Sequence, residues 1–460
     1  MRTSLSYSKR CLLALATAAS LGIGSAGAAI SAEEAAQLGT TLTPLGGERA
    51  GNADGSIPAW NGGLTTPPAG FVPGKHYVDP FPDDKPLFTI TAQNVEQYRD
   101  KLSAGQVALL RLYPQTLSYP VYTTRRTAAA PQWVYDNTRK NAVSATLLEG
   151  GNGFSNAYGG VPFPIPKSGV EAVWNHIARY RGTYLVRNLS EATVQTNGAY
   201  SLATFDQRVL FNYYIKDGDT SKLGNILFYY LAQARSPARN AGQAALVYET
   251  LDQVKEPRKA WGYVPGVRRV RRAPTLAYDT PEDNSDNLMT VDDRDMFNGS
   301  PDRYEWKLVG KQEMYIPYNN YRILSPSIKY KDLLQPGHIA PEQTRYELHR
   351  VWVVEGSLKS SARHIYSKRT FFLDEDSWQI AMADRYDNRG ELWRVGVGYL
   401  TNFYDLPTIW SSIDAFYDLQ ARRYVVHKLE NEESSTLDFT QPIPSLDLFK
   451  PASLQRMGSR

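Results

Sequence analysis

The chain has 460 residues, and its 51 Lys and Arg against 47 Asp and Glu give a formal net charge of +4 at pH 7. Arg2, Lys9 and Arg10 supply three of these positive charges, so the rest of the chain is almost neutral. Nucleic acid is therefore disfavoured as a partner, because phosphate binding needs a clustered positive excess. The one cysteine, Cys11, lies near the start, which excludes disulfides and thiolate chemistry from everything after it.

Residues 1–28 have the layout of a secretory signal peptide. Basic residues are followed by an uncharged run from Cys11 to Gly24 and then by small residues around Ala28. The uncharged run is about 14 residues long, shorter than the roughly 20 helical residues that span a bilayer. We therefore expect cleavage near Ala28, export from the cytoplasm and no membrane-spanning anchor.

Residues 29–90 are predicted to be an extended segment that wraps over the folded body. Gly, Pro, Asn and Asp recur as turn signals, and only 32–38 has the spacing of a short helix. Aromatic residues such as Trp60, Phe71 and Tyr77 favour wrapping, because disordered segments seldom carry so many of them.

Residues 91–182 are expected to form a helical cover. Apolar spacing near 3.6 residues and capping residues at Ser103 and Ser168 indicate helices. The predicted helices are 91–102, 103–113, 132–148 and 168–180.

Residues 183–430 change to alternating polar and apolar runs, which predict strands. Asn197-Gly198 is the strongest short hairpin signal. The predicted strands are 183–196, 199–214, 225–234, 243–251, 258–272, 304–315, 345–358, 363–373, 378–386, 392–399 and 419–429. So many closely linked strands must curl. We expect a mainly β, α+β fold: a large curved antiparallel sheet, or incomplete barrel, with helices across its concave face and a C-terminal tail over 431–460.

Catalytic motifs are missing from the sequence: there is no nucleophile elbow, paired zinc-binding histidines, phosphate-binding loop or dinucleotide fingerprint. The prediction is a protein that is not an enzyme and has no cofactor and no metal. His349 and His364 lie on adjacent predicted strands and could meet across a hairpin, where a polar cross-strand pair is favoured over a general base or a metal site.

An acidic segment over 279–299 lacks the central glycine and the closing glutamate of an EF-hand. We expect a solvated loop, with Thr290 and Asp293 capping a helix that Asn298-Gly299 ends. The acidic residues are Glu282, Asp283, Asp286, Asp292, Asp293 and Asp295.

Four arginines, Arg268, Arg269, Arg271 and Arg272, form the sharpest basic run. Two interpretations stay open: a structural role as buried residues with carboxylate partners, or an exposed group that holds an anionic head group by bidentate contacts.

Four stretches resemble a bacterial family catalogued as domain of unknown function 1329, which is similar to periplasmic outer-membrane lipoprotein-sorting proteins of the LolA and LolB kind. They are LGGERAGNADGSIPAW (45–60), WGYVPGVRRVRRAP (261–274), MYIPYNNY (314–321) and 346–378, which contains RVWVVE and LDEDSW. The resemblance implies an incomplete barrel over an apolar cavity that accepts acyl chains. It implies no catalytic residues. We expect a periplasmic protein, and two locations stay open: free in the periplasm or associated with the inner face of the outer membrane.

The leading hypothesis is a periplasmic carrier or binding protein for a lipid, a lipoprotein acyl chain or another hydrophobic small molecule, linked to envelope transport or lipoprotein sorting. An envelope assembly factor or transporter adaptor without a ligand is the alternative, and a lipid-modifying enzyme is third. The expected partners are the ligand, an outer-membrane or transporter protein and a membrane surface. The aromatic residues expected to line the cavity are Trp174, Tyr184, Phe211, Tyr213, Tyr229, Trp261, Trp352, Phe371, Trp378 and Trp393.

Overall fold

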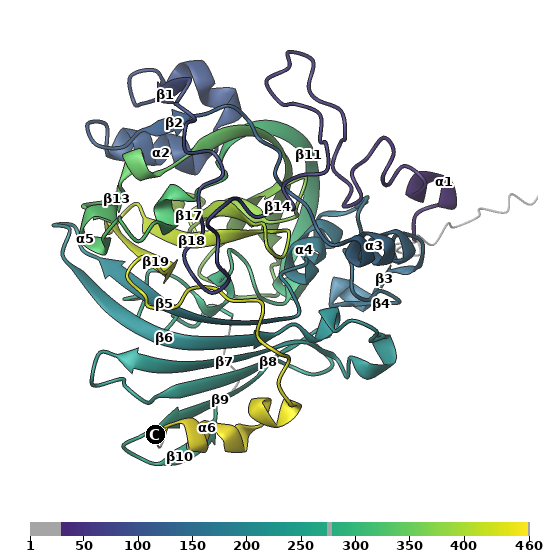
Figure 1. The fold of residues 1–460 in the computed structure, drawn as a ribbon, viewed down its shortest axis with the longest axis vertical. Coiled ribbons are helices and arrows are strands. Elements are labelled where there is room, and N and C mark those ends of the chain that lie inside the picture. The colour runs from purple at the N-terminus through teal and green to yellow at the C-terminus, as the bar shows by residue number, and fades with distance from the viewer. Residues whose placement is uncertain (1–28, 274–277, 459–460) are drawn as a thin grey trace, which may run out of the picture.

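A curved sheet of fifteen strands makes up most of the computed structural model, which describes residues 29–273 and 278–458 (Figure 1). The strands follow one another from β1 and β2 through β14–β19 to β5–β10, and β11 pairs with the other edge of β14. Neighbours are antiparallel apart from one parallel contact, between Val121 of β2 and Tyr346 of β14. The sheet does not close on itself, so the predicted mainly β fold with an incomplete barrel is confirmed.

The fifteen strands have the following bounds: β1 (Phe88–Ile90), β2 (Tyr119–Val121), β5 (Tyr184–Val194), β6 (Tyr200–Leu210), β7 (Ile226–Ser236), β8 (Ala244–Thr250), β9 (Lys259–Val264), β10 (Arg269–Arg272), β11 (Tyr304–Pro317), β14 (Tyr346–Leu358), β15 (Lys368–Asp374), β16 (Ile380–Tyr386), β17 (Leu392–Phe403), β18 (Thr408–Asp418) and β19 (Arg423–Leu429). Two small hairpins lie outside the sheet, formed by β3 (Thr146–Leu147) with β4 (Phe154–Ser155) and by β12 (Leu334–Gln335) with β13 (His338–Ile339).

The α-helices are short and lie mostly in the first half of the chain. They are α1 (Ala32–Ala35), α2 (Ala104–Leu112), α3 (Gln132–Ser144), α4 (Gly169–Ala178), α5 (Tyr330–Leu333) and α6 (Pro451–Gly458). The 3-10 helices are Val95–Lys101, Glu149–Gly151, Asn212–Tyr214, Thr220–Lys222, Val291–Asp293, Pro301–Arg303, Arg322–Leu324, Pro341–Gln343 and Leu446–Phe449. Within the two described ranges, no helix is long and apolar enough to cross a membrane. The predicted signal peptide lies outside them.

The hairpin predicted at Asn197-Gly198 is confirmed. β5 and β6 are paired along their whole lengths, and Gly198 turns between them at a φ of +85°. Glycine adopts this angle without the steric penalty that a side chain brings. Each of the remaining predicted strand ranges also contains a strand over at least part of its length.

Two strand predictions need correction. The predicted strand 258–272 is a hairpin of β9 and β10, because the chain turns at Pro265-Gly266 and Arg268 has a φ of +50°. β18 was not predicted at all. All eleven of its residues are buried, and its sequence, TIWSSIDAFYD, mixes polar and apolar residues on both faces, so it lacks the alternation that predicts a strand.

The helices α2, α3 and α4 are confirmed, whereas two other helix predictions are wrong. The range 91–102 contains a 3-10 helix rather than an α-helix. Thr290 and Asp293 do form a capping box, but the helix that they cap is a single 3-10 turn ending at Asp293. Asn298-Gly299 is therefore not its end.

The two faces of the sheet are covered by different segments. Asp384 and Arg385 are adjacent in β16 and so point to opposite faces. Asp384 accepts hydrogen bonds from Ser103 and from the backbone of Gly105, at the start of α2. Arg385 pairs with Asp293 of the acidic segment. Helix α4 lies near this segment, because His176 donates a hydrogen bond to the backbone carbonyl of Asp295.

The prediction of a solvated acidic loop is wrong for its second half. Asp292 and Asp293 are 2% and 1% exposed and pair with Arg369 and Arg385. Asp295 binds Arg179 and Arg181, and Glu282 binds Arg294. Arginines that point into the fold need carboxylate partners, and this segment supplies them.

The histidines His349 and His364 do not meet. The register of β14 and β15 places Ser357 opposite Lys368, so His364 lies before the paired residues. His364 is 3.3 Å from Asp292, whereas His349 contacts Glu347. The predicted cross-strand pair is therefore wrong.

Both ends of the described chain pack on the body. The indole nitrogen of Trp60 donates to the carbonyl of Ala128, and the Tyr77 hydroxyl donates to Asp405. At the other end, Phe449 and Leu454 are buried in an apolar cluster next to β8 and β9. These contacts hold the terminal segments against the sheet.

Candidate functional site

A cavity of about 100 Å³ lies on the face of the sheet that Arg385 occupies, where β18, β19, β5, β6 and β7 are successive neighbours. This space suits a few water molecules or a small chemical group; sites for drug-sized ligands measure about 300–1,000 Å³. The lining residues are Arg181, Arg187, Leu189, Glu191, Gln207, Val209, Phe211, Phe228, Tyr230, Arg294, Asp295, Asn298, Trp410, Asp414, His427 and Lys428.

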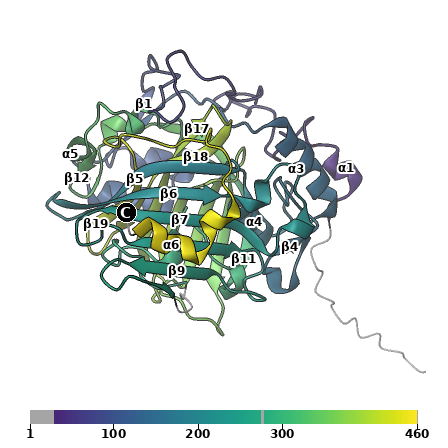
Figure 2. The same ribbon diagram turned by 60° about the horizontal axis from the view of Figure 1, so that its bottom comes forward.

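Strand alternation explains how these side chains come together. Arg187, Leu189 and Glu191 are every second residue of β5 and so point to one face. Gln207 lies opposite Arg187 in β6 and accepts a hydrogen bond from it. Leu210, three residues after Gln207 in β6, points to the opposite face of the sheet and joins the apolar cluster beneath α6. Helix α6 lies over the end of the sheet that contains β8 and β9 (Figure 2).

A β-bulge adds a second polar side chain from β19. His427 and Lys428 are adjacent, yet both line the cavity. The pairing of β19 with β5 shifts between Val426 and Leu429, and Lys428 has a φ of +70°. A bulge re-aims the side chain at its position, and here it turns an ammonium group into the cavity.

Charge pairs set the electrostatics of the cavity. Lys428 lies 2.7 Å from Asp414, and Asp295 binds the guanidinium of Arg181. Burial lowers the pKa of Lys428 and of Arg187. The pKa of His427 is lowered to about 3, mainly by burial and to a smaller extent by the neighbouring charge of Arg294. His427 is therefore neutral at pH 7.

Several polar atoms at the cavity are buried without a hydrogen-bond partner. They belong to Arg181 (Nε), Glu191 (Oε2), Asp414 (Oδ1) and His427 (Nε2). Buried polar atoms are costly unless they are hydrogen-bonded. The cavity therefore offers both donors and acceptors to a polar group or to water.

Apolar side chains lie among these charges. Phe211, Phe228 and Trp410 contribute aromatic rings, and Leu189 and Val209 contribute aliphatic groups. The Arg187 guanidinium lies 5.0 Å from the Trp410 ring centroid, a cation–π contact that orients the arginine. The lining therefore offers both polar and apolar contacts to a small group.

Of the ten aromatic residues predicted to bind a ligand, Phe211 lines this cavity. Tyr184, Tyr229 and Trp261 lie in the cluster beneath α6, on the opposite face. The remaining six pack elsewhere: Trp174 and Tyr213 against Phe154, Trp352 against Trp378, Phe371 against Phe297 and Trp306, and Trp393 against Arg394 and Tyr366. A ligand-binding role for the ten stays a prediction.

The arginines Arg268, Arg269, Arg271 and Arg272 are all exposed, on the β9–β10 hairpin. Among the described residues, no ion pair joins them to a carboxylate, so a buried structural pair is not formed. Val264 and Val267 of the same hairpin are 45% and 46% exposed.

The charged residues of the cavity were missed by sequence reasoning. Alternation shows which residues share a face but not whether that face meets water. The available signal was the spacing of Arg187, Glu191 and Gln207, which places charges on the face that also carries Leu189 and Val209.

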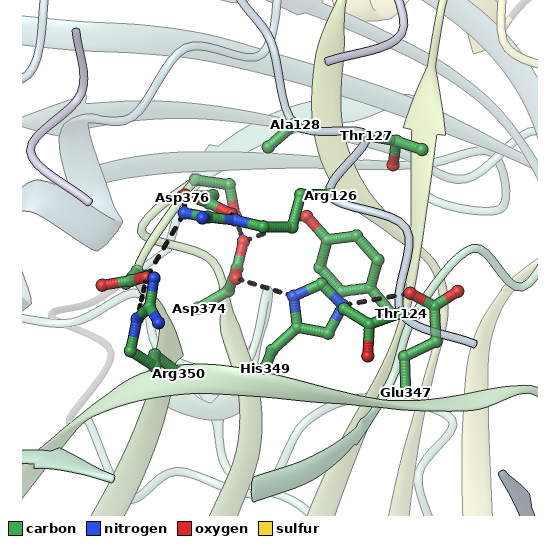
Figure 3. A network of polar contacts seen from close by, with 12 residues as sticks. Thr124, Arg126, Thr127, Ala128, Glu347, His349, Arg350, Asp374 and Asp376 are labelled. Carbon is green, nitrogen blue, oxygen red and sulfur yellow. Dashed lines mark hydrogen bonds and ion pairs between the residues drawn. The ribbon is translucent and has the colours of Figure 1, made fainter. Parts of the chain in front are cut away.

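A second group of buried polar residues could hold a metal ion. His349, Asp374 and Asp376 each offer a ligand atom, and these atoms lie within 4.8 Å of one another. This group is separate from the cavity, and Figure 3 shows it from close by.

Comparisons with known proteins identify relatives of the whole chain. A family model described as "Protein of unknown function (DUF1329)" matches residues 89–455. An uncharacterized protein of Pseudomonas aeruginosa is 50% identical over 434 residues, which is 94% of this chain and 95% of that protein.

Two solved structures resemble the chain more distantly. One is a domain from Vibrio parahaemolyticus whose title names outer membrane lipoprotein sorting: TM-score 0.43, 15% identity, 63% of this chain and 98% of that one. The other is a LolA superfamily protein from Nitrosomonas europaea: TM-score 0.37, 14% identity, 62% of this chain and 98% of that one. At TM-scores below 0.5, neither likeness carries a functional argument.

Proposed function

The chain belongs to the DUF1329 family, and we propose that it is a periplasmic carrier or binding protein for a lipid, a lipoprotein acyl chain or another hydrophobic small molecule that has a polar end. The observation that carries the proposal is the cavity, whose lining combines unpartnered polar atoms of Glu191, Asp414 and His427 with the rings of Phe211 and Trp410. The polar end of an amphipathic guest can satisfy those atoms while it contacts the rings.

The size of the cavity indicates how such a guest binds. About 100 Å³ accepts the polar end alone, so the apolar body needs further space. Arg294, Asp295 and Asn298 are the lining residues of the acidic segment, and the side chains of Arg294 and Asp295 are 30% and 14% exposed. We propose that the part of the acidic segment around Arg294 and Asp295 moves aside. The apolar body of the guest then occupies the space that this segment leaves.

The exposed β9–β10 hairpin supports a peripheral contact with a membrane. Its four arginines can bind anionic head groups, and Val264 and Val267 can insert between them. A carrier that collects its guest from a bilayer needs a contact of this kind. The leader-like N-terminus and the family resemblance support a role in envelope transport or outer-membrane lipoprotein sorting.

Native mass spectrometry tests the proposal on protein purified without detergent from a Gram-negative periplasm. The expected result is a reproducible bound molecule at close to one per chain, identified after organic extraction. A clean mass, together with no uptake of a fluorescent acyl probe, would rule the carrier out.

The second candidate is an envelope assembly factor or transporter adaptor without a ligand. The small volume of the cavity favours it, because an assembly factor needs no space for a guest. Crosslinking in intact cells distinguishes the two functions. An adaptor gives a stoichiometric protein partner and no co-purified molecule.

A further inference from the structure

The group around His349 lies on the opposite face of the sheet from the cavity. His349 and Glu347 alternate along β14, and Asp374 is the last residue of β15, opposite Val351. His349, Asp374 and Asp376 are 1%, 0% and 3% exposed. Figure 3 shows the imidazole of His349 between the carboxylates of Glu347 and Asp374.

The contacts of His349 fix the roles of its two ring nitrogens. Nε2 lies 3.1 Å from a carboxylate oxygen of Glu347, and a carboxylate can only accept, so Nε2 carries the hydrogen. In the tautomer with its hydrogen on Nε2, the ring presents the lone pair of Nδ1 on its other side. Glu347 is itself held by Arg345 and Asn319.

The Nδ1 lone pair points at an oxygen that also lacks a partner. Oδ1 of Asp374 is buried without a hydrogen bond and lies 4.0 Å from Nδ1. The other oxygen of Asp374 accepts from Tyr318 and Ser377. Two acceptors cannot hydrogen-bond each other, and a cation between them would satisfy both.

The arginines nearby do not supply that centre. Arg126 makes a bidentate contact with Asp376 at 2.7 and 2.8 Å, and Arg350 binds Glu375 at 2.7 Å. Among the described ion pairs, His349 is the one basic group beside Asp374. Asp374 is therefore a buried carboxylate with two acidic neighbours in the chain and, among the described residues, no Lys or Arg in an ion pair with it, an arrangement of high cost.

We propose that His349, Asp374 and Asp376 bind one divalent transition-metal ion such as Zn²⁺ or Mn²⁺. An imidazole nitrogen with carboxylate oxygens is a donor set that these ions accept, at metal–ligand distances of about 2.0–2.2 Å. Opposite ligands of an octahedral ion are about 4 Å apart, which matches the 4.0 Å between Nδ1 and Oδ1. Tetrahedral coordination, as at Zn²⁺, brings two ligand atoms to about 3.4 Å of each other. Glu347 orients the histidine from behind, as carboxylates do at metal-binding histidines.

The site is structural rather than catalytic. The ion joins the end of β14 to the turn after β15, and it offsets the charge of Asp374. Binding of the ion is therefore expected to stabilise the fold.

The test uses the full exported chain, without a histidine tag, purified in buffers without chelators. Elemental analysis is expected to find close to one zinc or manganese per chain. After chelation and dialysis, adding Zn²⁺ or Mn²⁺ is expected to raise the melting temperature, whereas Ca²⁺ is expected to have little effect. Protein without stoichiometric metal, and with no thermal response to either ion, would overturn the proposal.

Substitutions at the proposed ligands test where the ion binds. Asp374→Asn and His349→Gln are each expected to remove the bound metal and the thermal response. The matched control is His364→Gln, which changes another buried histidine beside an aspartate, Asp292, and is expected to keep both. Metal retained by both site variants would locate the ion elsewhere and refute the assignment. If one variant does not fold, the elemental analysis of the unaltered chain still tests whether the protein binds the metal.

Discussion

Buried charges are the main residue-scale feature of this molecule. Asp293 and Arg385 pair at 2.7 Å, and each is 1% exposed. In a pair removed from water, each charge depends on the other, because a lone buried ion is far more costly than the pair. The acidic segment is held to the sheet by pairs of this kind.

Removing one charge of this pair tests that description. Asp293→Asn is expected to lower the free energy of unfolding by about 3–5 kcal/mol, because it leaves Arg385 buried and unpaired. Adding Arg385→Met should restore part of the loss. Asp283→Asn, at an exposed position of the same segment, should change stability by less than about 0.5 kcal/mol. Chemical denaturation measures all three, and equal losses for Asp293→Asn and Asp283→Asn would show that the segment is solvated.

Asp384 gives a second residue-scale prediction, on pH. Burial raises the pKa of this carboxyl to about 6, above the usual value of an aspartate. The folded protein therefore binds the proton more tightly than the unfolded chain does, so this contribution to stability is complete below about pH 4 and is lost as the pH rises through 6.

Asp384→Asn removes that titration. Relative to the unaltered protein, the stability of the variant should increase by up to about 3 kcal/mol between pH 4 and pH 6.5. Subtracting the stability of the unaltered protein from that of the variant at each pH cancels the contribution of the buried histidines. That contribution to stability changes with pH in the opposite direction to the contribution of Asp384. Urea denaturation across this range measures it, with exposed Asp217→Asn as a control that should give a flat difference. A flat difference for Asp384→Asn would contradict the assignment.

Secondary-structure elements were predictable where one face of a strand is polar and the other apolar. β5, β6 and their turn follow from alternation and from Asn197-Gly198. β18 was not predictable in this way, since polar and apolar residues are mixed on both of its faces. The same limit hid the cavity, because Arg187 and Glu191 look like residues of a solvent-exposed face. The buried half of the acidic segment was missed because its arginine partners are distant in sequence.

The β9–β10 hairpin carries a prediction at the element scale. Replacing Arg268, Arg269, Arg271 and Arg272 by Ser should weaken binding to anionic vesicles at least tenfold, since each basic residue near such a surface contributes about 1 kcal/mol. The melting temperature should hardly change, because these side chains are exposed. Vesicle sedimentation measures the effect, with uncharged lipid and high salt as controls. Unchanged sedimentation would remove the hairpin from the membrane contact.

At the scale of the whole molecule, an open curved sheet supports separate sites on its two faces. One face carries the cavity, and the other carries the group around His349. The proposed function depends on ligand binding in the cavity, and a variant that fills the cavity tests it directly. Val209 lines the cavity, so Val209→Phe places a ring in that space. Val309, 50% exposed on β11, provides the matched control Val309→Phe.

The decisive measurement is native mass spectrometry of the unaltered protein, Val209→Phe and Val309→Phe, purified side by side from the same periplasm. We expect one bound amphipathic molecule in the unaltered protein and in Val309→Phe. We expect none in Val209→Phe, which should still unfold cooperatively. The same bound molecule in all three proteins, or none in any, would contradict a ligand site in the cavity.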